Sequence, residues 1–158
     1  MNSHREIERK FLVTGGAWQQ TEIVQQIRQG YLSTTKERVV RVRVKDELAT
    51  LTVKGITQNA SRIECEYDIP LDDANLMLDD LCQKPLIEKT RYRLLVKNRE
   101  WIVDEFHGEN SGLVVAEVEL NELDENIIIP DWAVVEITGD SRYYNSNLVT
   151  NPYRNWNE

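Results

Sequence analysis

Acidic and basic residues recur in this chain at a spacing that places them together on one face of a β-strand. The stretch EIERKFLV places Glu6, Glu8 and Lys10 on one face, with Ile7, Arg9 and Phe11 on the other. Antiparallel sheets that pack one face and expose the other commonly show such alternation. Like charges two residues apart repel each other, however, and folding does not require them, so the pattern points to a function.

The same alternation returns in most of the strands that follow. A single such strand is most simply a solvated face with weak cross-strand ion pairs. Its repetition, with both signs of charge, indicates that acids and bases meet on one surface. The charged positions of the expected strands are Glu6, Glu8, Lys10, Arg41, Arg43, Lys54, Arg62, Glu64, Glu66, Lys89, Arg91, Asp104, Glu117 and Glu119.

These residue types suit the chemistry of phosphate and of hard cations. Paired carboxylates offer the oxygen ligands that Mg²⁺ and Mn²⁺ prefer. Clustered Arg and Lys bind phosphate oxygens, and Arg does so through two parallel N–H groups. If the charged faces line the interior of a barrel, they can hold a phosphate chain together with a metal ion. The apolar faces then point outward, and helices must cover them, notably residues 71–82.

Composition narrows the class of protein and its partners. The chain has 158 residues, 41% hydrophobic and 29% charged, which is typical of one folded domain. A net charge of −8 argues against binding to nucleic acid or to an acidic membrane surface. No apolar run approaches the ~20 residues of a membrane helix, and no apolar signal segment opens the chain. Cys65 and Cys82 lack a CxxC spacing. We therefore expect a cytoplasmic protein, with its oligomeric state left open.

Hydrophobic periodicity and turn residues predict mainly β structure with a few helices, an α+β fold. About eight strands favour a closed antiparallel barrel or a strongly curved sheet. Two hairpins are expected to turn at Asp46-Glu47 and at Asn98-Arg99. The expected strands are 6–13, 28–34, 38–45, 48–54, 61–70, 87–95, 101–106 and 114–120. A brief helix or helical turn is expected within 16–27, and helical segments are expected at 71–82 and in the tail 139–149.

Eight short motifs in a fixed order closely resemble the CYTH domain, a family also called the triphosphate tunnel metalloenzymes. They are EIERK, RVR, TVK, RIECE, EKTRY, VDEF, EVEL and DSRYYN, and the resemblance spans residues 5 to about 149. The resemblance implies one CYTH domain over residues 1–158, with an eight-stranded antiparallel barrel whose tunnel binds a triphosphate and a divalent metal. It is nearest to the small bacterial inorganic triphosphatases; other members are thiamine triphosphatases, class IV adenylyl cyclases and RNA triphosphatases.

The resemblance also implies roles for individual residues. As ligands of Mg²⁺ or Mn²⁺ it implies Glu6, Glu8, Asp104, Glu117 and Glu119. As substrate-binding bases it implies Lys10, Arg41, Arg43, Lys54, Arg62, Lys89, Arg91 and Arg142. As catalytic groups it implies Glu64, Glu66, Asp104 and Lys89. Where some members carry a second base in the C-terminal segment, this chain has Tyr144.

Several functions remain open on these residues alone. The favoured one is metal-dependent hydrolysis of inorganic triphosphate to diphosphate and phosphate. An adenylyl cyclase must also fix base and sugar so that the 3′-hydroxyl meets the α-phosphorus, and the short predicted turns offer no segment for this. A thiamine triphosphatase shares the same residues. A non-catalytic polyphosphate- or nucleotide-binding module requires the bases but neither acid pair.

Overall fold

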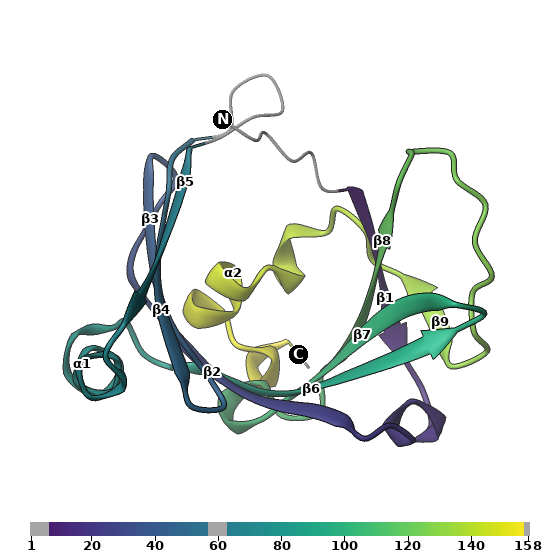
Figure 1. The fold of residues 1–158 in the computed structure, drawn as a ribbon, viewed down its shortest axis with the longest axis horizontal. Coiled ribbons are helices and arrows are strands. Elements are labelled where there is room, and N and C mark those ends of the chain that lie inside the picture. The colour runs from purple at the N-terminus through teal and green to yellow at the C-terminus, as the bar shows by residue number, and fades with distance from the viewer. Residues whose placement is uncertain (1–6, 57–62, 157–158) are drawn as a thin grey trace.

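The computed structural model describes residues 7–56 and 63–156, where nine strands form one antiparallel sheet (Figure 1). The strand order is β5-β4-β3-β2-β6-β7-β8-β1-β9. The strands are β1 (Ile7–Val13), β2 (Ile23–Thr35), β3 (Arg38–Lys45), β4 (Leu48–Lys54), β5 (Glu64–Ile69), β6 (Ile87–Val96), β7 (Arg99–Phe106), β8 (Val114–Leu120) and β9 (Ala133–Glu136).

The helices are short and lie on both sides of this sheet. The α-helices are α1 (Leu71–Leu76) and α2 (Asn145–Thr150), and a π-helix, η2 (Met77–Leu81), continues α1. The 3₁₀ turns are η1 (Ala17–Gln19), η3 (Gly108–Asn110), η4 (Ser141–Tyr143) and η5 (Tyr153–Asn155). No helix in the described part of the chain combines the length and the apolar character needed to cross a membrane.

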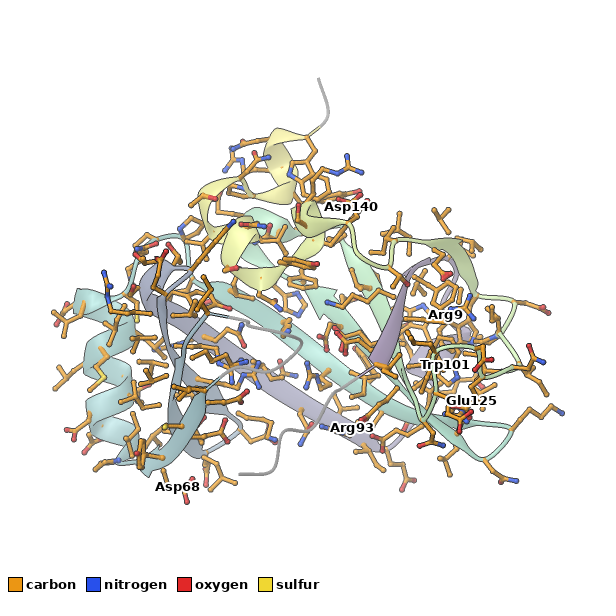
Figure 2. The ribbon with its side chains drawn as sticks, turned by 90° about the horizontal axis from the view of Figure 1, so that it is seen from above. Arg9, Asp68, Arg93, Trp101, Glu125 and Asp140 are labelled. Atoms are coloured by element: carbon orange, nitrogen blue, oxygen red, sulfur yellow. The ribbon has the colours of Figure 1, made fainter. Side chains whose placement is uncertain are left out.

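The sheet curves around α2, while α1 lies outside the curve (Figure 1). The charged residues share one face, because residues paired across strands point to the same side of the sheet. That face is the concave one, since Lys89 of β6 hydrogen-bonds Asn145 of α2 inside the curve. Glu8 lies opposite Glu119, and Arg91 lies opposite Asp104. Seen from above, Asp68 on β5 and Arg9 on β1 mark opposite sides of the molecule (Figure 2).

Apolar packing closes one end of this concave face and covers much of the convex one. Leu148 and Val149 of α2 belong to a core cluster with Tyr31, Ile87 and Phe106 of the sheet. On the convex side, a second cluster joins residues of α1 and η2 to β3 and β4. The prediction that a helix over 71–82 covers apolar strand faces is therefore confirmed for β3 and β4, whereas Trp18 and the loop residues Ile127 and Trp132 cover those of β1, β7 and β8.

A glycine allows that convex helix to approach the sheet. A Cβ added at Gly30 of β2 would lie 2.8 Å from the Cβ of Cys82 and 2.8 Å from Cδ2 of Leu86. Contacts that short are repulsive, so any side chain here would push the segment after η2 off the sheet. Gly30 thus sets the spacing between this segment and the sheet.

The mainly antiparallel β fold with few helices is confirmed, but details differ from expectation. The sheet has nine strands and is open: in the described part of the chain, β5 and β9 each pair with one strand. The brief helix or helical turn predicted in 16–27 is present as one 3₁₀ turn, η1, but the prediction is wrong from Ile23 onward, where β2 begins. Pairing of Ile23 with Arg93 of β6 overrides the local helical pattern. The second hairpin turns one residue early, at Lys97 and Asn98, which adopt φ of 50° and 66°.

Candidate functional site

A buried group of three charged side chains lies at the middle of the concave face. The Nζ atom of Lys89 lies 3.0 Å from Oδ2 of Asp104. Arg91 donates from Nε and Nη2 to the two oxygens of the same carboxylate, at 2.9 Å and 3.0 Å. Lys89 is 2% exposed and Asp104 3% exposed. One acid thus holds two neighbouring bases of β6 in fixed positions.

Burial and pairing act on these groups in opposite directions. Burial lowers the pKa of Lys89 from 10.5 to about 8, although Asp104 works against that shift. Burial alone would raise the pKa of Asp104, but the charges and hydrogen bonds of Lys89 and Arg91 outweigh it and hold the pKa at about 2. The carboxylate therefore stays ionised at neutral pH, whereas Lys89, with a pKa of about 8, titrates close to neutral pH.

Two further bases, Arg41 and Arg43, stand next to this group on β3. The Nε atom of Arg43 donates to Oε1 of Gln29 at 2.8 Å. Burial lowers the pKa of Arg43 to about 10, and the nearby charges of Arg41 and Arg91 contribute to the same shift. Because these cations repel one another, binding of an anion between them is favourable.

On β4 and β5, acids alternate with bases in a looser arrangement. Nη2 of Arg41 donates to the Thr52 hydroxyl at 3.3 Å, and that hydroxyl donates to Oε2 of Glu66 at 3.0 Å. Lys54 lies 3.9 Å from Glu64. Glu64 and Glu66 are both half-exposed, so each carboxylate is open to solvent on the concave face.

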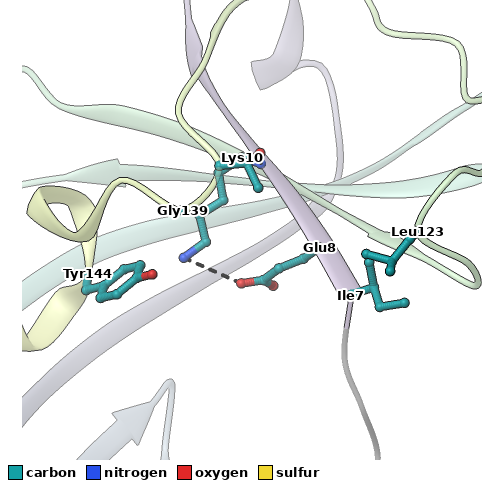
Figure 3. Close-up of a pocket in the computed structure, with 7 residues that line it drawn as sticks. Ile7, Glu8, Lys10, Leu123, Gly139 and Tyr144 are labelled. Carbon is teal, nitrogen blue, oxygen red and sulfur yellow. Dashed lines mark hydrogen bonds and ion pairs between the residues drawn. The ribbon is translucent and has the colours of Figure 1, made fainter. Parts of the chain in front are cut away.

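The β1 side of the face contains Lys10 between two acids. Its Nζ atom lies 3.4 Å from Glu8 and 3.7 Å from Glu117. The ring of Tyr144 approaches the same ammonium at 5.4 Å from the ring centroid. Glu8, Lys10 and Tyr144 line a pocket together with Ile7, Leu123, Thr138 and Gly139 (Figure 3).

The acids on this side of the face are of a type that binds divalent cations. Burial raises the pKa of Glu117, and the charges of Glu8 and Asp104 raise it further, so this carboxylate gains from an added positive charge. Glu119 pairs with Glu8 across the strands, which adds oxygen donors of the type that Mg²⁺ and Mn²⁺ use. Over residues 7–56 and 63–156, no three His, Cys, Asp or Glu side chains lie close enough to hold a metal. Glu6 lies outside the described residues.

The structure thus brings most of the predicted site residues onto one face. Those on it are Glu8, Lys10, Arg41, Arg43, Lys54, Glu64, Glu66, Lys89, Arg91, Asp104, Glu117 and Glu119. Both oxygens of Asp104 are engaged by Lys89 and Arg91, an arrangement that favours positioning of these bases over metal binding. Arg62 lies outside the described residues.

Arg142 is held away from the cluster. Its guanidinium pairs with the carboxylate of Asp140 at 2.6 Å and lies 5.4 Å from the ring centroid of Trp156. The C-terminal segment reaches the cluster through a different residue. Oδ1 of Asn145, at the start of α2, accepts a hydrogen bond from Nζ of Lys89 at 3.3 Å.

Sequence reasoning missed the neutral members of the site, namely Gln29, Thr52 and Asn145. Each hydrogen-bonds one of the bases, and Gln29 and Thr52 are completely buried. The signal for Thr52 was its position two residues before Lys54, on the same strand face. Gln29 could have been found only with the register that places it opposite Arg43.

Comparison with known proteins agrees with this geometry. The model of the CYTH domain matches residues 4–152. An inorganic triphosphatase of Acetivibrio thermocellus is 51% identical over 98% of this chain and 99% of its own length. One from Nitrosomonas europaea is 34% identical over 90% of this chain and 95% of its own.

Among solved structures, the inorganic triphosphatase NE1496 superposes with a TM-score of 0.74 at 32% identity. The match covers 91% of this chain and 93% of that one. The likeness therefore extends over both the motifs and the curved sheet that gathers them. With its acids and bases arranged on the concave face of that sheet, the chain belongs to the CYTH domain family.

Proposed function

We propose that this chain is a metal-dependent inorganic triphosphatase, which splits triphosphate into diphosphate and phosphate. One observation carries the proposal: bases from four strands converge on one concave face of a protein whose net charge is −8. These bases are Lys10, Arg41, Arg43, Lys54, Lys89 and Arg91. Such a concentration of cations in an acidic protein suits a short, highly charged anion. Both relatives described above are named inorganic triphosphatases, which supports the same substrate.

In this proposal the bases of the concave face bind the oxygens of the phosphate chain. Arg41 and Arg43 contribute planar forks, and Lys89 contributes a buried ammonium. Asp104 keeps Lys89 and Arg91 oriented before the substrate arrives, so little reorganisation accompanies binding. These cations also stabilise the negative charge that develops on the departing diphosphate.

The acids at the β1 side would hold a divalent ion, Mg²⁺ or Mn²⁺. Glu8, Glu117 and Glu119 are the candidates within the described residues. They are not close enough together there to hold an ion by themselves, so Glu6, the further candidate from sequence, or phosphate oxygens of the substrate would complete the ligand set. The bound ion supplies positive charge to the phosphate oxygens and favours attack on the phosphorus.

Hydrolysis then requires a water molecule placed in line with the anhydride bond that breaks. Glu64 and Glu66 lie on the same face as the bases and are open to solvent, so either carboxylate can orient the water and accept its proton. The new bond joins the water oxygen to the terminal phosphorus, and the electron pair of the broken bond stays with diphosphate. No His or Cys nucleophile is needed.

The test is phosphate release from inorganic triphosphate, ATP and thiamine triphosphate, each with Mg²⁺ and with Mn²⁺. We expect inorganic triphosphate to be the best substrate, ATP to be poorer, and chromatography to show no cyclic AMP. Cyclic AMP as the main product from ATP would instead make the chain a cyclase. Binding of triphosphate without any phosphate release would make it a non-catalytic module. We further propose that the protein acts in the cytoplasm on a small molecule, without nucleic acid or membrane as partner.

A further inference from the structure

Gln29 is a completely buried amide in the middle of β2, within a face made mostly of charged residues. Its Oε1 atom accepts the 2.8 Å hydrogen bond from Nε of Arg43, and its Nε2 atom lies 3.5 Å from the Tyr31 hydroxyl. Because a guanidinium only donates hydrogen bonds, the amide oxygen must face Arg43. The amide group is therefore fixed in one orientation by its two neighbours.

The partner of Arg43 differs in charge from the partner of Arg91. Arg91 donates from Nε and Nη2 to the Asp104 carboxylate, whose negative charge neutralises the guanidinium. Arg43 gives only Nε to an uncharged amide, and in the described part of the chain no carboxylate lies within 4.0 Å of its nitrogens. Its two terminal nitrogens make no hydrogen bond to those residues. Arg43 thus keeps both its charge and its phosphate-binding arms.

We propose that Gln29 is a positioning residue that holds Arg43 by Nε and leaves the terminal nitrogens and the full positive charge for the triphosphate. The amide suits this role because it accepts a hydrogen bond without adding negative charge. A carboxylate at the same place would orient Arg43 equally well but would neutralise it and repel the substrate. The role rests on the proposed function, since it concerns the same anion.

The test compares Gln29→Glu and Gln29→Met with the wild-type chain. Glu keeps an acceptor but adds charge, whereas Met keeps the size but removes the acceptor. Loss of one charged hydrogen bond to a phosphate corresponds to about a tenfold or greater change in affinity. We expect Gln29→Glu to raise the Kd for triphosphate at least about tenfold, and Gln29→Met to raise it by less. If orientation alone mattered, Gln29→Glu would instead stay nearer to wild type than Gln29→Met.

The chain offers a matched control four residues earlier on β2. Oε1 of Gln25 accepts from Nε of Arg93 at 3.0 Å, the same type of contact, but Arg93 is also paired with Glu100 at 2.8 Å. Gln25→Glu therefore adds the same charge to the same strand beside an arginine that already has an acid partner. It should change the Kd far less than Gln29→Glu, and an equal effect of the two variants would overturn the proposal.

Binding is measured by calorimetry in a chelator, and phosphate release is measured on the same variants with metal. In an Arg43→Met background, Gln29→Met should have no further effect on the Kd, because no guanidinium remains to be positioned; an undiminished effect there overturns the role. If Gln29→Glu does not fold, this pair of Met variants decides the question. Wild-type binding without turnover refutes only the hydrolysis, and turnover with wild-type KM and Kd in both Gln29 variants refutes only the role of Gln29.

Discussion

Asp104 lies between Lys89 and Arg91 and pairs with both, and the ammonium and the carboxylate are almost fully buried. Removing the acid leaves two cations of the interior without the carboxylate that pairs with them, and Lys89 keeps only its hydrogen bond to the uncharged Asn145 among the described residues. We expect Asp104→Asn to lower the free energy of unfolding by about 3–5 kcal/mol in denaturant titration. The control is Glu100→Gln, which breaks the exposed pair with Arg93 and should cost less than about 1 kcal/mol. Equal losses of unfolding free energy in the two variants would show that the buried pair stabilises the fold no more than the exposed pair does.

Because the pKa of Lys89 is lowered, folding stability and triphosphate binding should depend on pH with opposite signs. Between about 8 and 10.5, Lys89 is neutral when folded and protonated when unfolded, so folding releases a proton. Its contribution to stability is therefore fully present above 10.5 and is lost as the pH falls through about 8. Binding of triphosphate follows the other direction, since it requires the ammonium, which stands among Asp104, Arg91, Arg43 and Glu117.

We accordingly expect the KM for triphosphate to rise above pH about 8, approaching a tenfold change per pH unit. Lys89→Arg, which stays charged, should shift this rise in KM, the alkaline limb of the pH profile, to higher pH. Lys97→Arg changes an exposed turn lysine in the same way and should leave the limb where it is. An alkaline limb that Lys89→Arg does not move would assign the titration to another group.

Metal dependence is tested at the acids beside Lys10. A chelator should abolish phosphate release, and added Mg²⁺ or Mn²⁺ should restore it. Glu8→Gln keeps the shape of the side chain and removes its charge, so turnover should fall about 100-fold or more, as when an electrostatic stabiliser is lost. Glu122→Gln alters an exposed acid after β8 and should keep full turnover. Undiminished activity in chelator would rule out a metal at this site.

Gly30 supplies a prediction about packing alone. Gly30→Ala places a methyl group 2.8 Å from Cys82 and Leu86, and we expect a loss of about 1–3 kcal/mol in unfolding free energy. Gly55→Ala is the comparison, because its Cβ would meet Ile63 at an ordinary 3.6 Å. If both variants unfold alike, the segment after η2 can shift without cost.

Strict alternation of charged and apolar residues makes most of the strands predictable from the sequence. The first hairpin follows the expected bounds, 38–45 and 48–54, because valines and charges alternate from Val40 to Lys45 along its first strand. The four residues of β9 carry too little pattern to predict, and this strand is defined by its pairing with β1. The helical prediction over 16–27 failed from Ile23 onward for the same physical reason, since long-range pairing with β6 decides the conformation there.

The candidate site divides in a similar way. Charged residues are recognisable by type, and their faces follow from period two, so the cluster is predictable. Neutral partners such as Gln29 and Asn145 carry no such signal, because only the register and the position of α2 bring them to Arg43 and Lys89. The pairing of Arg142 with Asp140 likewise depends on the path of the C-terminal segment.

An open sheet leaves its outermost strand as a template for unwanted association. In the described sheet β5 pairs only with β4, so its other edge has free backbone groups that another chain could add to. Glu64, Glu66 and Asp68 alternate along this edge. A second copy docked edge to edge would bring the same acids together, and like charges on adjoining strands repel. The acids of β5 therefore also protect the protein against aggregation through its own exposed strand.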